Sequence, residues 1–273
     1  MENTNFDLLY DRLESRWNCN YLIKKYIHHD KFNAIKKLIN PSWKILDVGR
    51  GGSVDGVLGV LLANEGYNIT ISNVDDLHLK VIKKFAKKLN VNNIDYVISN
   101  PENMVFNDNS FDLVISLHTL EHAKDFNKGI SEIYRVTNKY AIIALPTCLN
   151  PCVAVRLGGG EYYKHNINNL KSFFKGNTKI LNSIIKKQDF VPENMIEIST
   201  PIIHKWYFPK QMRKILNKHF YIIKFGADCL CFPSFDCLTK LSNILGNYRY
   251  NPLLRDFGMG SHALLKKREQ KND

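Results

Sequence analysis

The sequence Lys44-Ile45-Leu46-Asp47-Val48-Gly49-Arg50-Gly51-Gly52-Ser53 decides the fold of this chain. It starts as a short apolar strand, reaches an acidic residue and continues into a glycine-rich turn. Apolar residues recur at helical spacing in the next segment, 54–64. A strand, a glycine turn and a helix in this order let the backbone approach a ligand closely, while the helix N-terminus offers free N–H groups to an anion. Many nucleotide-binding folds share this arrangement, so the rest of the chain has to distinguish among them.

The remainder of the chain alternates predicted strands and helices, which is typical of an α/β fold. Further strands are expected at residues 67–74, 94–99, 111–116, 140–145, 220–225 and 262–267. Helices are expected at residues 54–64, directly after Asp76, and at 123–136, 170–185 and 210–218.

Two acidic residues stand at the end of the second predicted strand. Asp75 follows the glycines by about 25 residues, close to the spacing of an acidic residue that hydrogen-bonds the ribose hydroxyls of a nucleoside. Asp76 is its rival for this role and is also well placed to N-cap the following helix. The turn lacks the full G-x-G-x-x-G pattern because Val54 is the residue three after Gly51, which argues against a dehydrogenase.

Motifs at matching spacings continue to the fifth predicted strand: Leu46-Asp47-Val48-Gly49-x-Gly51, Val74-Asp75, Ser110-Phe111-Asp112-Leu113-Val114-Ile115-Ser116 with Leu120-Glu121-His122, and Glu132-Ile133-x-Arg135-Val136. With these motifs, residues 44–146 resemble the core of the class I S-adenosylmethionine-dependent methyltransferases, in the small-molecule branch that includes quinone and sterol methyltransferases. The resemblance implies a Rossmann-like, doubly wound, seven-stranded sheet that is mostly parallel with an antiparallel last strand. It also implies N-terminal helices and an insertion after strand five.

This reading divides the chain into consecutive parts. They are an N-terminal helical segment at 1–42, the cofactor-binding core at 43–147, an insertion or lid over the active site at 148–204, the C-terminal part of the same fold at 205–268, and a tail at 269–273. Gly158-Gly159-Gly160 is expected to be a flexible break in the insertion. Ligands of open α/β sheets bind beyond the carboxyl ends of the strands, so the insertion is expected to cap the substrate; a surface elaboration without substrate contact is the alternative.

The resemblance implies S-adenosyl-L-methionine as the cofactor. Gly49 and Gly51 are expected to let the backbone pass beneath its methionine part, and the N–H groups near Gly52 are expected to face its carboxylate. Asp47 would hold the turn and contact the amino group through water. Arg50 stands where the family usually has a small residue, so it either pairs with the carboxylate, points into solvent or obstructs the site.

The adenosine part is assigned to the ends of the next strands. Asp75, with Asp76 as the alternative, would accept hydrogen bonds from the ribose. Asn100 stands where the family usually has an aspartate for the adenine amino group, and its carbonyl oxygen can still accept; Glu102 is the alternative. The resemblance also places Pro101 against the adenine ring and Leu117 at the methyl end of the cofactor.

Methyl transfer needs an aligned nucleophile, and a general base only where that nucleophile is protonated. His118 and His122, at the top of strand four, are the catalytic candidates, although His122 could equally pack on a helix face. Tyr163 and His204 are candidates for substrate contact. No metal site is expected, because the C-x3-C pair at Cys148 and the C-x-C pair at Cys229 differ from the C-x2-C spacing of structural zinc sites.

The expected acceptor is a small or lipid-like molecule methylated on oxygen or carbon. The formal net charge of +12 motivates an RNA or protein methyltransferase as the alternative, but the lysines form scattered pairs, so nucleic acid is not favoured. A non-catalytic cofactor-binding or scaffold protein of the same fold is the alternative from another class. No apolar run approaches the roughly 18 residues that span a bilayer, and no signal peptide pattern is present, so a cytoplasmic location is expected.

Overall fold

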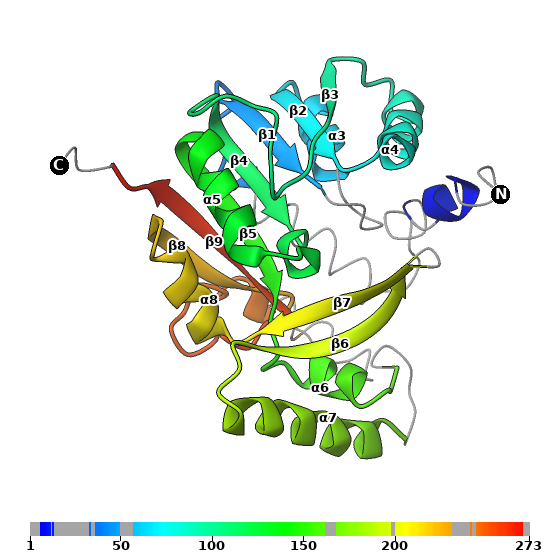
Figure 1. Ribbon diagram of the computed structural model, residues 1–273, viewed down its shortest axis with the longest axis vertical. Helices are drawn as coiled ribbons and strands as arrows, with labels where there is room; N and C mark the ends of the chain where they lie inside the picture. Colours follow the sequence, from blue (N-terminus) through cyan, green and yellow to red (C-terminus); the bar gives the residue numbers. More distant parts are fainter. Residues whose placement is uncertain are drawn as a thin grey trace.

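The computed structural model describes residues 6–11, 13, 33, 36–49, 57–161, 168–197, 200–230, 241 and 244–269. The strands of its main sheet are β1 (Lys44–Val48), β2 (Asn68–Asn73), β3 (Ile94–Ile98), β4 (Phe111–Leu117), β5 (Thr137–Pro146), β8 (Phe220–Asp228) and β9 (Gly260–Lys267). They form a seven-stranded sheet in the order β3-β2-β1-β4-β5-β9-β8 (Figure 1). The strands β1 to β5 pair in parallel, and β9 runs antiparallel to both β5 and β8. The expected fold class, including the antiparallel last strand, is confirmed.

The parallel strands form because both of their faces are covered. In β1 the four residues after Lys44 are all buried, and Ile45 and Leu46 are fully enclosed. Such continuous apolar runs are typical of a parallel sheet with helices on both sides. The covering helices are α3 (Val57–Asn64), α4 (Asp76–Lys88), α5 (Phe126–Val136) and α8 (Pro209–Leu216), with a short 3-10 helix, η1 (Leu120–His122), after β4.

The start of α4 differs from the expectation in one detail. Asp75, not Asp76, is the N-cap residue, because its backbone is extended and its side chain accepts a hydrogen bond from the N–H of His78. Asp76 is the first residue of the helix and pairs with Lys80 one turn later. The prediction that Asp76 caps the helix is therefore wrong, and the cap satisfies one of the free N–H groups of the first turn.

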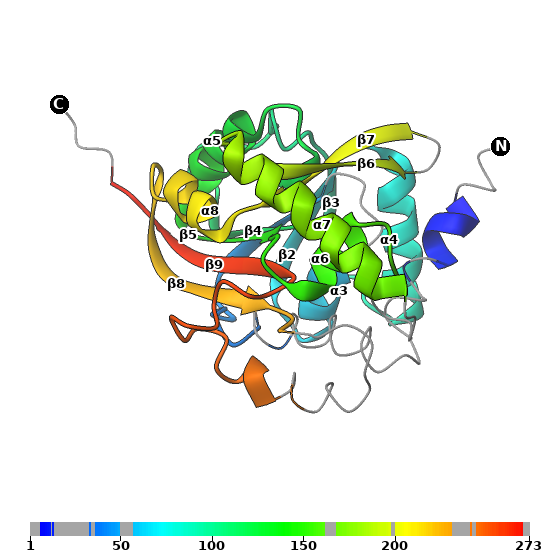
Figure 2. The ribbon, with the colours of Figure 1, turned by 90° about the horizontal axis from the view of Figure 1, so that it is seen from below.

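The insertion after β5 contains two helices and a hairpin: α6 (Pro151–Leu157), α7 (Asn168–Ile185), β6 (Phe190–Glu197) and β7 (Thr200–Tyr207). The helix expected at 170–185 is present, whereas the hairpin was not expected. The expected boundary between residues 204 and 205 lies within β7. The hairpin lies beyond the arrowheads of β4 and β5, and α6 and α7 lie on its outer side (Figures 1 and 2).

Two backbone contacts and one side chain hold the hairpin to the main sheet. The N–H of Cys148 donates to the carbonyl oxygen of Tyr207 at 3.1 Å, and Thr147 forms an isolated bridge with the same residue. Lys205 Nζ donates to the carbonyl oxygen of Ala123 at 2.7 Å, directly after η1. The hairpin therefore has a fixed place beside the loop that follows β4.

Gly158 corrects the expectation of a flexible break. It is the C-cap residue of α6 with an ordinary φ of −80°, and of the three consecutive glycines only Gly159 has a positive φ, at +88°. A Cβ added to Gly158 would lie 1.8 Å from the carbonyl oxygen of Ser172 in α7. The glycine is present because two helices meet there, not because the chain bends freely.

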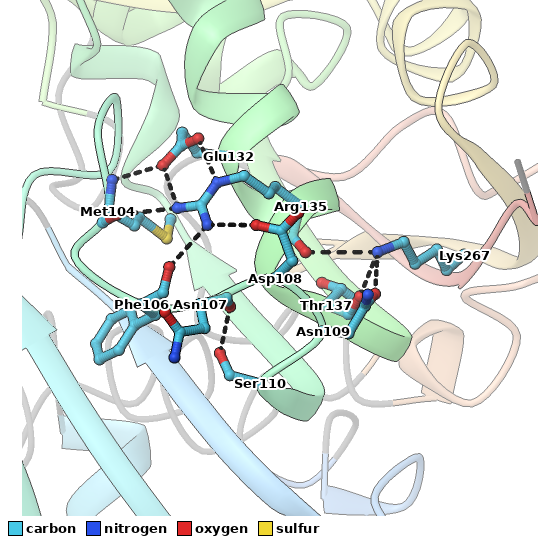
Figure 3. A network of polar contacts seen from close by, with 10 residues as sticks. All are labelled: Met104, Phe106, Asn107, Asp108, Asn109, Ser110, Glu132, Arg135, Thr137 and Lys267. Atoms are coloured by element: carbon cyan, nitrogen blue, oxygen red, sulfur yellow. Dashed lines mark hydrogen bonds and ion pairs between the residues drawn. The ribbon is translucent and has the colours of Figure 1, made fainter.

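An arginine on α5 organises the loop between β3 and β4 (Figure 3). Arg135 donates to both oxygens of Glu132 at 2.8 Å, and to the carbonyl oxygens of Met104 and Phe106 at 2.9 and 2.7 Å. Glu132 in turn accepts from the N–H of Met104. This paired guanidinium explains the Glu132-Ile133-x-Arg135 motif as a structural clamp that fixes the loop leading from β3 toward β4.

Candidate active site

Asp47, at the carboxyl end of β1, is a buried carboxylate with one clear structural partner. Its Oδ2 accepts a hydrogen bond at 2.9 Å from the N–H of Gly59, in the first turn of α3. A Cβ on Gly59 would lie only 2.9 Å from this oxygen, so the glycine permits the close approach. Asp47 thus ties the end of the strand to the helix that follows the glycine turn, where the helix dipole favours a negative charge. Gly49 continues the β1–β2 ladder through its N–H to Ser72, whereas Gly51 and Gly52 lie outside the described residues.

The burial of Asp47 has a measurable consequence for stability. Burial raises the pKa of Asp47 to about 6, against the opposing effect of the hydrogen bond from Gly59. Since this pKa lies above the ordinary value of 3.8, the folded chain binds the proton more tightly than the unfolded chain. The free energy of unfolding therefore falls as the pH rises through the window between these two values.

We expect Asp47→Asn to remove this loss, because an amide oxygen can still accept from Gly59 while no charge is buried. Relative to wild type, the variant should gain up to about 3 kcal/mol of stability between about pH 4 and pH 7. Urea unfolding of both proteins across this range measures the gain. A difference in stability that stays constant with pH would contradict the assignment.

Asp75 and its neighbours line the carboxyl end of β2. Both oxygens of Asp75 lie within 2.8 Å of His78 Nδ1, and the side chain is 44% exposed. Burial raises the pKa of Asp75, but the hydrogen bonds from His78 outweigh it, so the pKa lies below its usual range. Asp76 points its carboxylate to Lys80 instead. Next to Asp75, the buried Nδ2 of Asn73 has no hydrogen-bond partner among the described residues, as is common where a ligand supplies the acceptor.

The expected adenine contacts lie at the end of β3. Asn100 is exposed, and its Oδ1 accepts from the N–H of Glu102, which forms a local turn around the buried Pro101. The carboxylate of Glu102 accepts from the N–H groups of Lys124 and Asp125 at 3.1 and 2.9 Å. Glu102 thus fixes the loop before α5. Asn100 is the more accessible of the two candidates for contact with the adenine base.

The loop after β4 places a histidine at the same edge of the sheet. Leu117 is half-buried at the end of the strand, and His118 follows with a φ of +53°. This left-handed conformation is uncommon for a residue other than glycine. It is held by the N–H of His118, which donates to the carbonyl oxygen of Ala144, and by Thr119 Oγ1, which donates to the carbonyl oxygen of Val48. Such a held strain is typical of functional sites.

Three histidines lie around the buried carboxylate of Glu121. Its Oε1 lies 3.5 Å from His118 Nδ1, 3.9 Å from His122 Nε2 and 3.9 Å from His204 Nε2. Burial works against the charge of Glu121, but the adjacent imidazoles outweigh it, so its pKa lies below the usual range. Burial lowers the pKa of His204 to about 3, so this ring is neutral. The rings of His122 and His204 meet edge to face with centroids 5.1 Å apart.

A second buried carboxylate lies on the other side of His118. Asp228, at the end of β8, has its Oδ2 3.8 Å from His118 Nε2 and its Oδ1 2.6 Å from His262 Nδ1. His262 Nε2 in turn lies 3.0 Å from the hydroxyl of Tyr250. The imidazole of His118 therefore has a carboxylate beside each nitrogen, an arrangement that stabilises a proton on the ring.

The structure brings together three of the residues that the sequence singled out, namely His118, His122 and His204. Tyr163 lies outside the described residues. Sequence reasoning missed Asp228 and His262, and it treated Glu121 only as part of a motif. The only signal for Asp228 and His262 in the sequence is their position. Asp228 ends β8 and His262 lies near the start of β9, and the ends of these antiparallel neighbours meet at one sheet edge.

Comparisons with known proteins find similarity to methyltransferases. Residues 46–145 match the methyltransferase domain family model. A ubiquinone/menaquinone biosynthesis C-methyltransferase from Rickettsia prowazekii is 29% identical over 158 residues, which cover 50% of this chain and 63% of the relative. A cycloartenol-C-24-methyltransferase from Oryza sativa is 30% identical over 122 residues, covering 44% and 35% of the two chains. The chain thus spans less than two thirds of the length of these relatives.

Solved structures show the same fold at lower identity. An S-adenosylmethionine-dependent methyltransferase from Methanosarcina mazei superposes with a TM-score of 0.55 at 16% identity, covering 86% of this chain and 96% of the other. A putative one from Listeria monocytogenes gives a TM-score of 0.56 at 14% identity, with 88% and 98% covered. Residues 46–145 therefore match a methyltransferase domain, the chain has the fold of S-adenosylmethionine-dependent methyltransferases, and its sequence is similar to those of quinone and sterol C-methyltransferases.

Proposed function

We propose that this protein transfers a methyl group from S-adenosylmethionine to an oxygen or carbon atom of a small or lipid-like acceptor. The proposal rests on the observation that two adjoining sets of side chains lie at the same edge of the sheet. In the first set, Asp47, Asp75 and Asn100 lie at the carboxyl ends of β1, β2 and β3. The second set, the histidines around Glu121 and Asp228, follows beneath the hairpin β6–β7.

The first set fits the cofactor in its chemistry. Asp75 offers a partly exposed carboxylate for ribose hydroxyls while it also caps α4. Asp47 is a buried carboxylate that lowers stability when ionised, a cost that an ammonium group nearby would offset. The cofactor itself supplies an electrophilic methyl group on a sulfonium.

The second set fits the acceptor. His118 is the most exposed of the three histidines beside Glu121, with 31% of its side chain open, compared with 14% and 10% for His122 and His204. It would accept the proton of an acceptor hydroxyl as the methyl bond forms, with Asp228 and Glu121 stabilising the charged ring. His204 is buried and His122 is mostly buried beside it, and both would shape the acceptor site.

The acceptor class rests on the relatives. The names of two of them state C-methylation in quinone biosynthesis and at position C-24 of cycloartenol. Both reactions act on largely apolar molecules, so a quinone-like or sterol-like acceptor is the first to test. Within the described residues, none of the helices is both long enough and apolar enough to cross a bilayer.

Asp75 and Asp76 provide a matched pair for testing the cofactor assignment. Asp75→Asn retains a good N-cap residue but removes the charge, and we expect the Kd for S-adenosylmethionine to rise by about 10-fold or more, the value of a hydrogen bond to a charged group. Asp76→Asn should change it less than about two-fold, because its carboxylate faces Lys80. Calorimetric titration with S-adenosylmethionine, S-adenosylhomocysteine and NADH measures these values. No binding of either sulfur nucleoside to the wild type, or an equal effect of the two variants, would overturn the assignment.

A further inference from the structure

Glu121 is a buried charge without the hydrogen bonds that normally accompany one. The residue is fully enclosed, and neither carboxylate oxygen has a hydrogen-bond partner among the described residues. Nearly all buried polar groups in folded proteins do have one, and an ionised carboxylate is far more costly to leave without compensation. Three imidazoles face the carboxylate, but their nitrogens stand 3.5 to 3.9 Å from its Oε1, which leaves the place suited to a more closely bound cation.

The surrounding side chains have the chemistry and spacing of metal ligands. One ligand atom each from Glu121, His122 and His204 all lie within 4.8 Å of one another. Two of the three separations, from Glu121 Oε1 to each imidazole Nε2, are 3.9 Å. Ligand atoms of zinc stand about 2.1 Å from the ion, which puts two of them about 3.4 Å apart in a tetrahedral site. A small movement of the side chains would bring all three around one ion.

We infer that Glu121, His122 and His204 bind a divalent transition-metal ion, with Zn²⁺ as the reference case. Two imidazoles and one carboxylate are the protein ligands of many catalytic zinc sites, which keep a further position open. Mg²⁺ and Ca²⁺ prefer oxygen ligands, so a site with two nitrogens disfavours them.

The three ligands come from elements that the fold holds in place. Glu121 and His122 lie on η1, and His204 lies on β7 of the hairpin. The hydrogen bond from Lys205 Nζ to the carbonyl oxygen of Ala123 joins these two elements next to the site. A metal ion there would add a second link, so the insertion would be stabilised on the sheet by the ion.

A role for the ion in methyl transfer rests on the proposed function, although the binding itself does not. His118 Nδ1 lies 3.5 Å from Glu121 Oε1, so the ion would sit next to the residue assigned to the acceptor. At this place it would bind the oxygen of an acceptor hydroxyl, lower the pKa of that hydroxyl and ease transfer of its proton to His118.

The test is metal binding by the full chain in the absence of cofactor and acceptor. After treatment with a chelator, titration with Zn²⁺ and with Co²⁺ should show one site per chain, and Zn²⁺ should raise the Tm. Mg²⁺ should not compete at millimolar concentration. Glu121→Gln and His204→Ala should each weaken Zn²⁺ binding by about 100-fold or more, because each removes a ligand. His219→Ala, a partly buried histidine beside Tyr134, is the matched control and should change it less than about two-fold.

The cysteines are the competing explanation for any zinc that binds. The Co²⁺ complex distinguishes them, since thiolate ligands give an intense charge-transfer band in the near ultraviolet that imidazole and carboxylate do not. That band, or Zn²⁺ affinity unchanged in folded His204→Ala, would overturn the inference even if Glu121→Gln fails to fold. No binding to the wild type would overturn it as well. Titration with S-adenosylmethionine on the same samples separates a failure of this site from a failure of the proposed function.

Discussion

Replacing His118 with alanine is expected to lower kcat for methyl transfer by about 100-fold or more, the usual contribution of a positioned proton acceptor. Its imidazole has Glu121 at 3.5 Å from one nitrogen and Asp228 at 3.8 Å from the other. Two nearby carboxylates stabilise the ring after it has taken a proton. The Kd for S-adenosylmethionine should stay within about two-fold of wild type, because the carboxylates proposed to bind its amino and ribose groups lie at the ends of other strands. Release of S-adenosylhomocysteine with a quinone-like or sterol-like acceptor measures kcat.

The unusual backbone of His118 requires a control. At a φ of +53°, alanine is strained, so a loss of activity could come from a displaced loop. Asparagine tolerates this conformation and keeps a polar side chain, but it cannot take up a proton. His118→Asn should therefore be as slow as His118→Ala. An active asparagine variant would show that the residue only shapes the loop, and an active alanine variant would show that the acceptor needs no base.

Asp228→Asn tests whether Asp228 acts through its negative charge or only through its hydrogen bond to His262. The amide retains an oxygen for His262 but no longer stabilises a charged His118, so kcat should fall by about 10-fold with little change in KM. His118→Ala combined with Asp228→Asn should be no slower than His118→Ala alone, because Asp228 acts through the histidine.

The strands of the main sheet could be predicted from the sequence because each is specified by residues that are close together in the chain. Each strand is a short apolar run with a polar residue at its carboxyl end, and in a parallel sheet those ends meet at one edge. That rule alone placed Asp47, Asp75 and His118 at a common edge. It also explains why Asp75 is a candidate for the cofactor site, while the choice of N-cap between Asp75 and Asp76 depends on one backbone conformation that sequence does not fix.

The site beside His118 was only half predictable because it is assembled from distant segments. His204 is a candidate from the sequence, but nothing local shows that it meets Glu121, since that contact depends on a hairpin that the sequence analysis does not predict. In β7 buried and exposed residues do not alternate regularly, since the neighbours Trp206 and Tyr207 are both buried. The sequence of this segment therefore lacks the two-residue period that predicts a strand. Asp228 and His262 meet only because β9 lies between β5 and β8.

Gly176→Ala is expected to destabilise the insertion by about 3 kcal/mol or more, although it adds a single methyl group in the middle of a helix. The added Cβ would lie 1.8 Å from the carbonyl oxygen of Ala154 in α6. The same two helices meet at Gly158, whose Cβ would lie 1.8 Å from the carbonyl oxygen of Ser172 in α7. Since both obstacles are backbone atoms, relief requires the helices to separate, and the apolar contacts between them are lost with the close approach.

Intrinsic helix propensity predicts the opposite sign, which makes the experiment decisive. Alanine favours a helix over glycine by about 1 kcal/mol, so Gly176→Ala should stabilise the chain if α7 were a free surface helix. Gly159→Ala, in the same segment, is the control: its Cβ meets nothing within 4 Å, and its φ of +88° should cost about 1 kcal/mol. Urea unfolding should rank the variants with Gly176→Ala well below Gly159→Ala. A stabilised Gly176→Ala would mean that α6 and α7 do not pack at this distance, and that the hairpin and His204 are held without them.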